Sequence, residues 1–121
     1  MIKLDYRDAR PIYVQIKEGI KALLVSGALA PGERLPSVRE LATQLTNNPN
    51  TIARAYRELT NEGFLYSVPG RGSFVVPEED TAKLKKQELF RSFDKAAKDL
   101  TDVGVGTDEL IDRLRTKEGS K

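Results

Sequence analysis

The stretch "TNNPNTIARAYREL", Thr46–Leu59, decides the fold of this chain. Asn48 is a residue type that caps helices, and Pro49 suits a first helical position because its missing N–H would have no partner there. At about 100° per residue, three apolar side chains share one face: Ile52, Tyr56 and Leu59. The opposite face carries long hydrogen-bonding side chains: Asn50, Arg54, Arg57 and Asn61. The pattern predicts a two-faced helix from Pro49 that stops at Gly63.

Two shorter helices are predicted before it. Pro11 opens the first and Gly27 ends it, with an apolar stripe at helical spacing: Ile12, Ile16, Ile20 and Leu23. Ser37 and Glu40 form the sequence pattern of a capping box at the start of the second. Its expected buried face is Val38, Leu41, Ala42 and Leu45.

A hairpin is predicted after Gly63. The segments 64–68 and 73–76 are rich in aromatic and β-branched residues, and the turn Pro69–Gly72 joins them. Three helices followed by a hairpin, with a tight turn between the second and third helices, predict a winged helix-turn-helix over residues 1–76.

Residues 77–121 are predicted to form two more helices, on either side of the break at Gly104–Gly106. The first carries an apolar stripe at alternating spacings of four and three: Leu89, Phe93, Ala96 and Leu100. The second has a short apolar edge: Leu110, Ile111 and Leu114. Two such helices cannot bury a core between themselves, and a second copy of the chain is the simplest cover. The expected fold is therefore mainly α with a small β-hairpin, a winged helix-turn-helix followed by a short two-helix dimerisation tail.

The composition narrows the possible functions. With 121 residues, 39% hydrophobic and 31% charged, the chain has the make-up of an ordinary soluble protein. It lacks cysteine and histidine, and no set of residues resembles a nucleophile with its base or a metal site, so we expect neither an enzyme nor a cofactor. No signal peptide or membrane-spanning run is evident, which favours the cytoplasm.

The polar face of the third helix suits a DNA groove. Arginine can donate two hydrogen bonds to guanine, and asparagine pairs in the same way with adenine. Arg54 lies in the middle of this face and is the first candidate for reading a base edge, while Arg57, further along, can contact a base or a phosphate. Asn50 and Thr51 lie in the first turn, where side chains and free backbone N–H groups can reach a base or a phosphate. The alternative is a merely solvated helix face.

Two further segments are candidate DNA contacts. Arg39 can face the edge of the groove, or it can form an ion pair with a neighbouring carboxylate. The hairpin tip, Gly70, Arg71 and Gly72, suits a minor groove because glycines allow close approach and arginine suits the negative potential there. A tight turn alone would also explain these glycines. Phe90 and Phe93 serve either packing or contact with a small apolar effector.

The segment Pro11–Val75 resembles the N-terminal winged-helix domain of the GntR family of bacterial transcription regulators. Three pieces carry the resemblance in the family's order and spacing: "LPSVRELA", "NPNTIARAYREL" and "GRGSFV". The resemblance implies that the DNA-contacting positions include Arg39, Asn50, Thr51, Arg54, Gly70 and Arg71. Asn47 departs from the pattern, because it stands where an apolar residue normally packs.

The short helical tail resembles the YtrA-type subfamily, whose two C-terminal helices are used for dimerisation. The resemblance implies a homodimeric regulator, most simply a repressor, of a partly palindromic operator in double-stranded DNA, with control of a transporter operon suggested. Large effector domains of other relatives are missing, so an effector is left open. The alternative from another class is a winged helix that binds proteins and never touches DNA.

Overall fold

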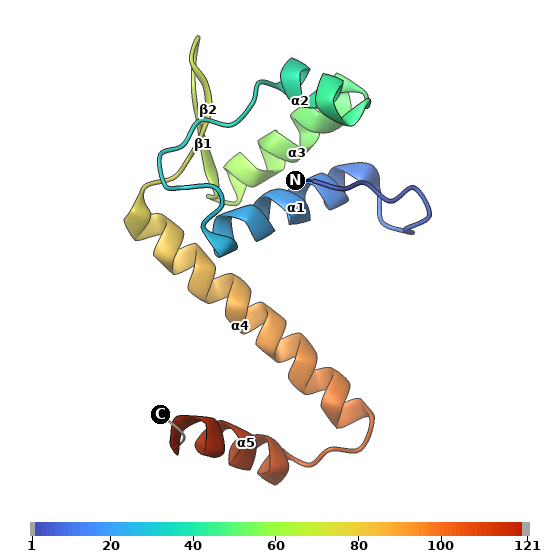
Figure 1. Cartoon of the computed structure of the whole chain (residues 1–121), viewed down its shortest axis with the longest axis vertical. Coiled ribbons are helices and arrows are strands. Elements are labelled where there is room, and N and C mark those ends of the chain that lie inside the picture. The colour runs from blue at the N-terminus through green and yellow to red at the C-terminus, as the bar shows by residue number, and fades with distance from the viewer. Residues whose placement is uncertain (1, 120–121) are drawn as a thin grey trace. The chain divides into compact units, whose positions relative to one another are not determined.

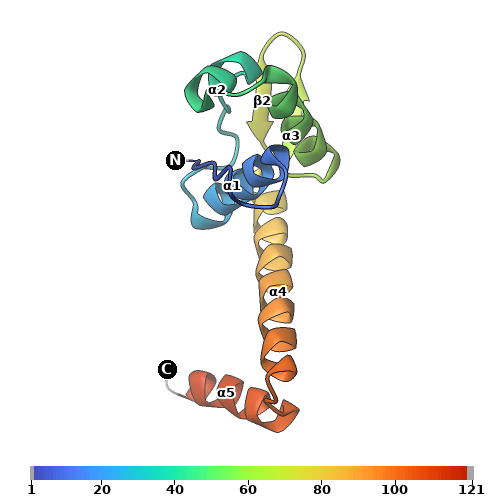
Figure 2. The same cartoon turned by 90° about the vertical axis from the view of Figure 1, so that its right-hand side faces the viewer.

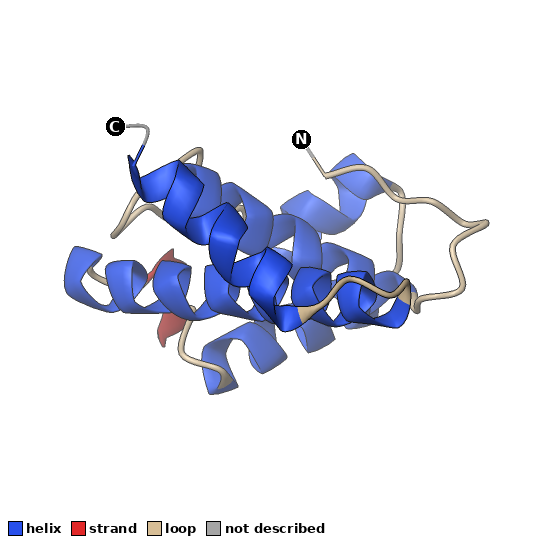
Figure 3. Cartoon of the chain, turned by 90° about the horizontal axis from the view of Figure 1, so that it is seen from below, coloured by secondary structure: helices blue, strands red, loops and turns tan. Residues whose placement is uncertain are grey.

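The computed structural model describes residues 2–119, with side chains for residues 2–116 (Figure 1). The elements in chain order are α1 Ile12–Ser26, α2 Val38–Leu45, α3 Pro49–Asn61, β1 Leu65–Val68, β2 Gly72–Val75, α4 Glu78–Asp102 and α5 Thr107–Gly119. The chain divides into two compact units, Met1–Lys85 and Lys86–Lys121. Helices dominate, and the described strands form one small hairpin (Figure 3). The predicted fold class is confirmed.

Helix α1 begins and ends where the sequence predicts. Pro11 is its N-cap, and Gly27 closes it in the left-handed conformation with φ 84°, a region that costs glycine nothing. Its inner stripe is buried at Ile16, Ile20 and Leu24. Leu24 lies deeper than the predicted Leu23, which is only half-buried.

Helix α2 starts with the predicted capping box. The Ser37 hydroxyl accepts from the Glu40 backbone N–H at 3.0 Å, and the Glu40 carboxylate accepts from the Ser37 backbone N–H at 3.0 Å. These backbone and side-chain hydrogen bonds from Ser37 lower the pKa of Glu40. The helix ends at Thr46, which takes the left-handed conformation with φ 50°, a position that strains a β-branched residue.

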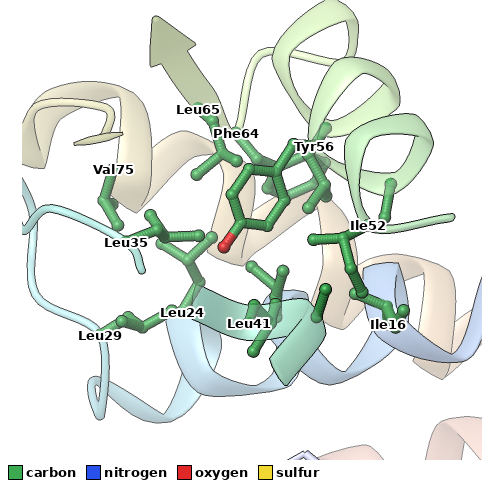
Figure 4. Close-up of a cluster of buried hydrophobic side chains, with 14 residues drawn as sticks. Ile16, Leu24, Leu29, Leu35, Leu41, Ile52, Tyr56, Phe64, Leu65 and Val75 are labelled. Carbon is green, nitrogen blue, oxygen red and sulfur yellow. The ribbon is translucent and has the colours of Figure 1, made fainter. Parts of the chain in front are cut away.

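Helix α3 packs against α1, α2 and β1, and Figure 2 shows its ribbon beside those of α1 and α2. Ile52 and Leu59 are fully buried, and Tyr56 is nearly so, with its hydroxyl donating to the Pro36 carbonyl at 2.7 Å. The helix ends at Asn61 with Glu62 as its C-cap, and Gly63 follows directly, as the sequence predicts, with a φ of 89° that lets the chain turn into the hairpin. Figure 4 shows the Tyr56 ring extending from α3 towards Leu35 and Leu41.

The hairpin is antiparallel, with Leu65 opposite Val75 and Val68 opposite Gly72. The second strand begins at Gly72, which the sequence had assigned to the turn. Arg34, in the connection before α2, forms a bridge with Phe74 and so ties this connection to the hairpin. The inward side of the pair joins the core through Leu65 and Val75, while Tyr66 and Phe74 stack on the other side with ring centroids 5.5 Å apart.

The tail, which follows the hairpin, differs from the preceding elements in how far its side chains are buried. Thr81 and Leu84 in the first turns of α4 still belong to the first unit, Thr81 being buried and Leu84 packed against the core. Among the described side chains of the second unit, residues 86–116, none is buried. Gly104, with φ 99°, ends α4 before α5 begins at Thr107. None of the described helices is long and apolar enough to cross a membrane.

Candidate nucleic-acid interface

The exposed face of α3 carries the predicted polar residues. Asn50, Arg57 and Asn61 are exposed, and Thr51 is half-buried. In the described part of the chain, the Arg57 guanidinium has no ion pair or hydrogen bond. A groove lies beside this face, between α3 and the hairpin, and Arg57 and Thr60 line it together with Ser67 and Ser73. A cation and several hydroxyls therefore meet where a polyanion could lie.

The N-terminus of α3 is already capped, which corrects one expectation. The Asn50 backbone N–H donates to the Asn48 side-chain oxygen at 2.8 Å, and the Thr51 N–H donates to the Asn48 carbonyl at 3.0 Å. Pro49 has no N–H to offer. The free backbone donors that the sequence suggested are thus in use, because the cap satisfies them internally. Contacts from this turn must come from the side chains of Asn50 and Thr51.

Arg54 is exposed but held. Its side chain is 52% exposed, its Nε donates to the Glu58 carboxylate at 3.0 Å, and its guanidinium carbon lies 3.7 Å from the centre of the Tyr13 ring. These two contacts draw Arg54 towards α1, while Arg57 has no such contact. The two arginines of the predicted face therefore have different surroundings: one is positioned by the fold and one is free.

An ion-pair cluster joins α1 to α3 beneath Arg54. Lys17 donates to Glu58 at 3.0 Å and to Glu62, and Lys21 lies 3.1 Å from Glu62. Burial opposes the charge on Glu62, but hydrogen bonds from Lys17 and Lys21 outweigh it and lower the pKa. Hydrogen bonds from Lys17 and then Arg54 lower the pKa of Glu58. The cluster links α3 to α1, and no local sequence pattern indicates it, because its lysines lie more than forty residues before the glutamates they contact.

Arg39 projects from the first turn of α2. Its side chain is exposed, and no described carboxylate lies within ion-pair distance, so the ion-pair alternative does not hold. Arg39 lines an open groove together with Thr43, Thr46 and Asn48, which lies between α2 and the start of α3. The Arg39 side chain thus lies at a groove beside the start of α3.

The hairpin tip is braced from outside the hairpin. The Arg34 Nε donates to the Arg71 carbonyl at 2.9 Å, and a Cβ on Gly72 would stand 3.3 Å from that Nε. Gly70 and Gly72 take φ values of 77° and 116°, which favour glycine. The Arg71 side chain stays exposed and makes no described ion pair. Arg34 is a site residue that the sequence analysis missed, because no local pattern links it to the turn.

Asn47, the departure from the family pattern, has polar partners in place of apolar packing. Its side-chain oxygen accepts from the Asn48 N–H at 2.9 Å, and its amide nitrogen donates to the Tyr6 hydroxyl at 3.2 Å. The N-terminal segment is held in turn by buried Gln15, whose side chain makes two hydrogen bonds with the Asp5 backbone at 2.9 and 3.0 Å. The segment before α1 thus reaches the turn that precedes α3.

The tail residues predicted for dimerisation are solvent-accessible. Leu89, Phe93 and Leu100 on α4 are 58%, 47% and 42% exposed, and Ala96 between them is also exposed. On α5, Ile111 and Leu114 are exposed and Leu110 is half-buried. Phe90 is 57% exposed, so the described chain leaves about half of the surface of each phenylalanine uncovered. The effector contact through Phe90 and Phe93 stays a prediction.

No group of acidic side chains in the described residues could hold a metal ion. The arrangement around α3 offers arginine, amide and hydroxyl groups at an open surface. Such groups bind phosphates and base edges by hydrogen bonding and charge.

Comparison with known proteins places this geometry in a family. The model of the family described as "Bacterial regulatory proteins, gntR family" matches residues 12–75. The chain is 48% identical over 81 residues to the HTH-type transcriptional repressor YtrA of Bacillus subtilis (strain 168), a match that covers 67% of this chain. The matched region spans 62% of that repressor's length, which is less than two thirds.

Solved structures extend the likeness to the tail. A GntR family transcriptional regulator from Listeria monocytogenes superposes with a TM-score of 0.79 at 32% identity, over 93% of this chain and 98% of that chain. AraR(DBD) in complex with operator ORE1 superposes with a TM-score of 0.55 at 34% identity, over 63% of this chain and 93% of that chain.

Proposed function

The chain belongs to the gntR family of bacterial regulatory proteins, and on that premise we propose that it is a homodimeric transcription repressor that binds a partly palindromic operator in double-stranded DNA. The observation that carries the proposal is the exposed polar face of α3, with Arg39 beside its start and Arg71 at the hairpin tip, neither of which forms an ion pair with the described residues. The operator complex of AraR(DBD) supports DNA as the partner, and the name of the YtrA relative supports repression.

Each DNA-facing residue has a role that follows from its surroundings. Asn50 and Arg57 have exposed side chains that make no hydrogen bond or ion pair with the described residues. They are our candidates for reading base edges in the major groove. Thr51, in the first turn of α3, and Arg39, in the first turn of α2, suit phosphates. Arg71, presented by Gly70 and Gly72, suits the adjacent minor groove, where negative potential attracts arginine.

Arg54 requires its own test, because two internal contacts hold it. We propose that its guanidinium, oriented by Glu58 and Tyr13, keeps N–H groups available for DNA. Arg54→Ala should then weaken operator binding about tenfold or more without changing the dimer. Glu58→Gln removes the charge of this ion pair but keeps Arg54 and an amide oxygen that can accept its Nε hydrogen bond, so it should cost far less affinity than Arg54→Ala. Equal losses in both variants, measured by fluorescence anisotropy, would instead assign Arg54 a purely structural role.

We further propose that residues 1–76 bind DNA and residues 77–121 hold two copies together. The alternating stripe of the tail, Leu89, Phe93, Ala96 and Leu100, has the spacing of a two-helix seam, and its exposure leaves it available to a partner. Edges of α5 would extend the seam: Leu110, Ile111 and Leu114. Two copies would set their α3 helices in successive major grooves, about one DNA turn or ~34 Å apart.

The identity of the regulated genes requires the operator sequence. A transporter operon is our proposal by family likeness, and action on chromosomal DNA implies the cytoplasm. Sequencing the fragments that the protein selects from a random pool would supply the operator, and genomic matches would then identify the genes.

The same selected operator distinguishes the proposal from a protein-binding winged helix. DNA affinity should fall steeply and linearly, on logarithmic axes, with added salt, because arginine–phosphate contacts release counterions. A selected palindrome bound in this way supports the proposal. A pool that shows no enrichment, together with no binding at low salt, would favour the protein-binding alternative.

A further inference from the structure

The first unit contains an apolar pocket of about 230 Å³ that lies away from the proposed DNA-binding face of α3. Its walls come from α1, α2, α3, the connection between α1 and α2, and the N-terminal segment: Ile2, Ile20, Leu23, Leu29, Leu35, Pro36, Leu41, Gln44, Leu45 and Tyr56. Several wall residues, including Ile20, Leu35 and Leu41, are almost fully buried, so the pocket reaches into the core. Figure 4 shows Leu29, Leu35 and Leu41 gathered around the end of the Tyr56 ring.

The chemistry of the walls defines what fits. None of the lining residues is ionisable at neutral pH, and burying an unpaired charge there would be costly. Two polar groups interrupt the hydrocarbon. The Tyr56 hydroxyl donates its hydrogen to the Pro36 carbonyl and therefore keeps lone pairs that can accept a hydrogen bond. Gln44, which is exposed, presents an amide. The site therefore favours an uncharged molecule with one hydrogen-bond donor.

The volume limits the size of that molecule. Dry apolar cavities of about 150 Å³ in protein cores accept benzene. The larger space here suits a one-ring or fused two-ring compound. We propose that this pocket binds a small, uncharged aromatic molecule whose N–H or O–H donates to the Tyr56 hydroxyl oxygen.

The N-terminal segment forms one wall and offers an entry path. Ile2 lies against Gly19 on α1, where an added Cβ would stand 3.3 Å from the Ile2 side chain. The described hydrogen bonds that hold this segment lie further along, at Asp5 and Arg10, which bond to the Gln15 side chain, and at Tyr6, which bonds to the Asn47 side chain. The part of the segment that carries Ile2 can therefore move aside without breaking these hydrogen bonds.

A molecule in this pocket touches both helices of the helix-turn-helix. Leu41 and Leu45 belong to α2, and Tyr56 belongs to α3 one residue before Arg57. A molecule bound in the pocket should therefore change the spacing between α2 and α3. A change in this spacing would shift the DNA-facing side of α3. This regulatory consequence rests on the proposed function; binding to the pocket does not.

Indole is a suitable probe, with benzoate as a charged control of similar size. Methyl NMR of the full chain should show saturable shifts at Ile20, Leu35 and Leu41 on addition of indole and none with benzoate. Leu23→Phe, which fills the pocket from α1, should weaken indole binding by roughly tenfold or more. The matched control is Val25→Phe, on the same helix but outside the pocket, and it should bind like the parent.

Gln44→Glu provides a second variant that leaves the core intact. A carboxylate at this position should also weaken indole binding, because it places a charge beside an apolar site. The core stays intact because the Gln44 side chain is exposed. No saturable methyl shifts up to the solubility limit of indole would overturn the site, as would parent-like indole binding by both pocket variants.

Operator affinity, measured with and without saturating indole, tests the coupling. A several-fold change supports it, and an unchanged affinity alongside saturable methyl shifts overturns it. If the protein without indole binds no operator, the proposed function fails, and the methyl titration still decides whether the pocket is a binding site.

Discussion

The winged unit and the tail of this protein treat their apolar side chains in opposite ways. In the winged unit, α1, α2, α3 and the hairpin enclose a shared core in which Ile16, Ile52 and Leu59 are fully buried. Among the described side chains of residues 86–116, none is buried, and most of the chain's large exposed hydrophobic residues lie there. The first unit buries most of its apolar side chains, whereas the described part of the second leaves its apolar side chains exposed or only half-buried.

This difference implies two kinds of stability. Burial inside the winged unit stabilises one chain and does not depend on protein concentration. A seam between two tails contributes only when two chains meet, so its contribution rises with concentration. The following predictions, in order of decreasing effect, test this distinction.

The largest effect should come from the core of the winged unit. Ile52→Ala removes methyl groups from a fully buried site on α3 and should lower the free energy of unfolding by about 2–5 kcal/mol. Urea unfolding followed by circular dichroism measures this loss, and we expect it at every protein concentration. Ile52→Val, expected to cost about 1 kcal/mol, keeps the test usable if the alanine variant does not fold. A loss of unfolding free energy seen only at low protein concentration would contradict the idea that the winged unit is stable without a partner chain.

A smaller effect, of a different kind, should follow from a charge in the tail. Phe93→Asp buries a carboxylate in the proposed seam and should weaken the dimer by about 3 kcal/mol, or roughly a hundredfold. Analytical ultracentrifugation should show monomers, while the winged unit remains folded. Gln87→Asp adds the same charge about 200° away from Leu89 on α4 and serves as the control. Intact dimers of the Phe93 variant would show that the stripe is not the seam.

The turn between α2 and α3 offers a stabilising change. Thr46 holds a left-handed conformation that glycine adopts without strain, so Thr46→Gly should raise the unfolding free energy by up to about 1 kcal/mol. Differential scanning calorimetry should detect a higher melting temperature, and the dimer dissociation constant should stay the same. A lower melting temperature would mean that the Thr46 side chain contributes more than its backbone strain costs.

Acid should act on the winged unit through the cluster between α1 and α3. Glu62 has its pKa lowered below the ordinary 4.5, because the hydrogen bonds from Lys17 and Lys21 outweigh the effect of burial. Its contribution to stability is therefore present above pH 4.5 and is lost as the pH falls through the lowered value. The effect should stay below ~1 kcal/mol, since the pair is partly exposed.

Glu62→Gln should flatten this pH dependence in urea unfolding. Glu79→Gln, at an exposed carboxylate in the first turn of α4, should leave it as in the parent. Identical pH profiles for the two variants would show that this cluster does not cause the loss of stability in acid.

The sequence predicted those features whose signals are local. The capping box needs only Ser37 and Glu40, and the start of α3 needs only Asn48 and Pro49. The helical period likewise indicated the face of α3 that is buried. The start of the second strand was misjudged, because Gly72 is a common turn residue and only its pairing with Val68 places it in the strand.

The remaining features join residues far apart in the chain. Arg34 braces the hairpin tip, Tyr6 reaches Asn47, and Lys17 pairs with Glu62 across some forty residues. No periodicity or cap encodes such contacts, since they depend on how complete elements pack. The internal contacts of Arg54 were missed for the same reason. The helical spacing of the sequence places Arg54 on the polar face of α3, but it cannot show that Tyr13 lies beside Arg54.

Footprinting on the selected operator tests the central claim most directly. Methylation protection should reveal two groups of shielded guanine N7 atoms in the major groove, about 10 base pairs apart and related by the palindrome. Arg57→Ala should lose protection within both groups while remaining dimeric. A single protected patch, or protection that Arg57→Ala leaves unchanged, would contradict a dimer that reads DNA with the exposed face of α3.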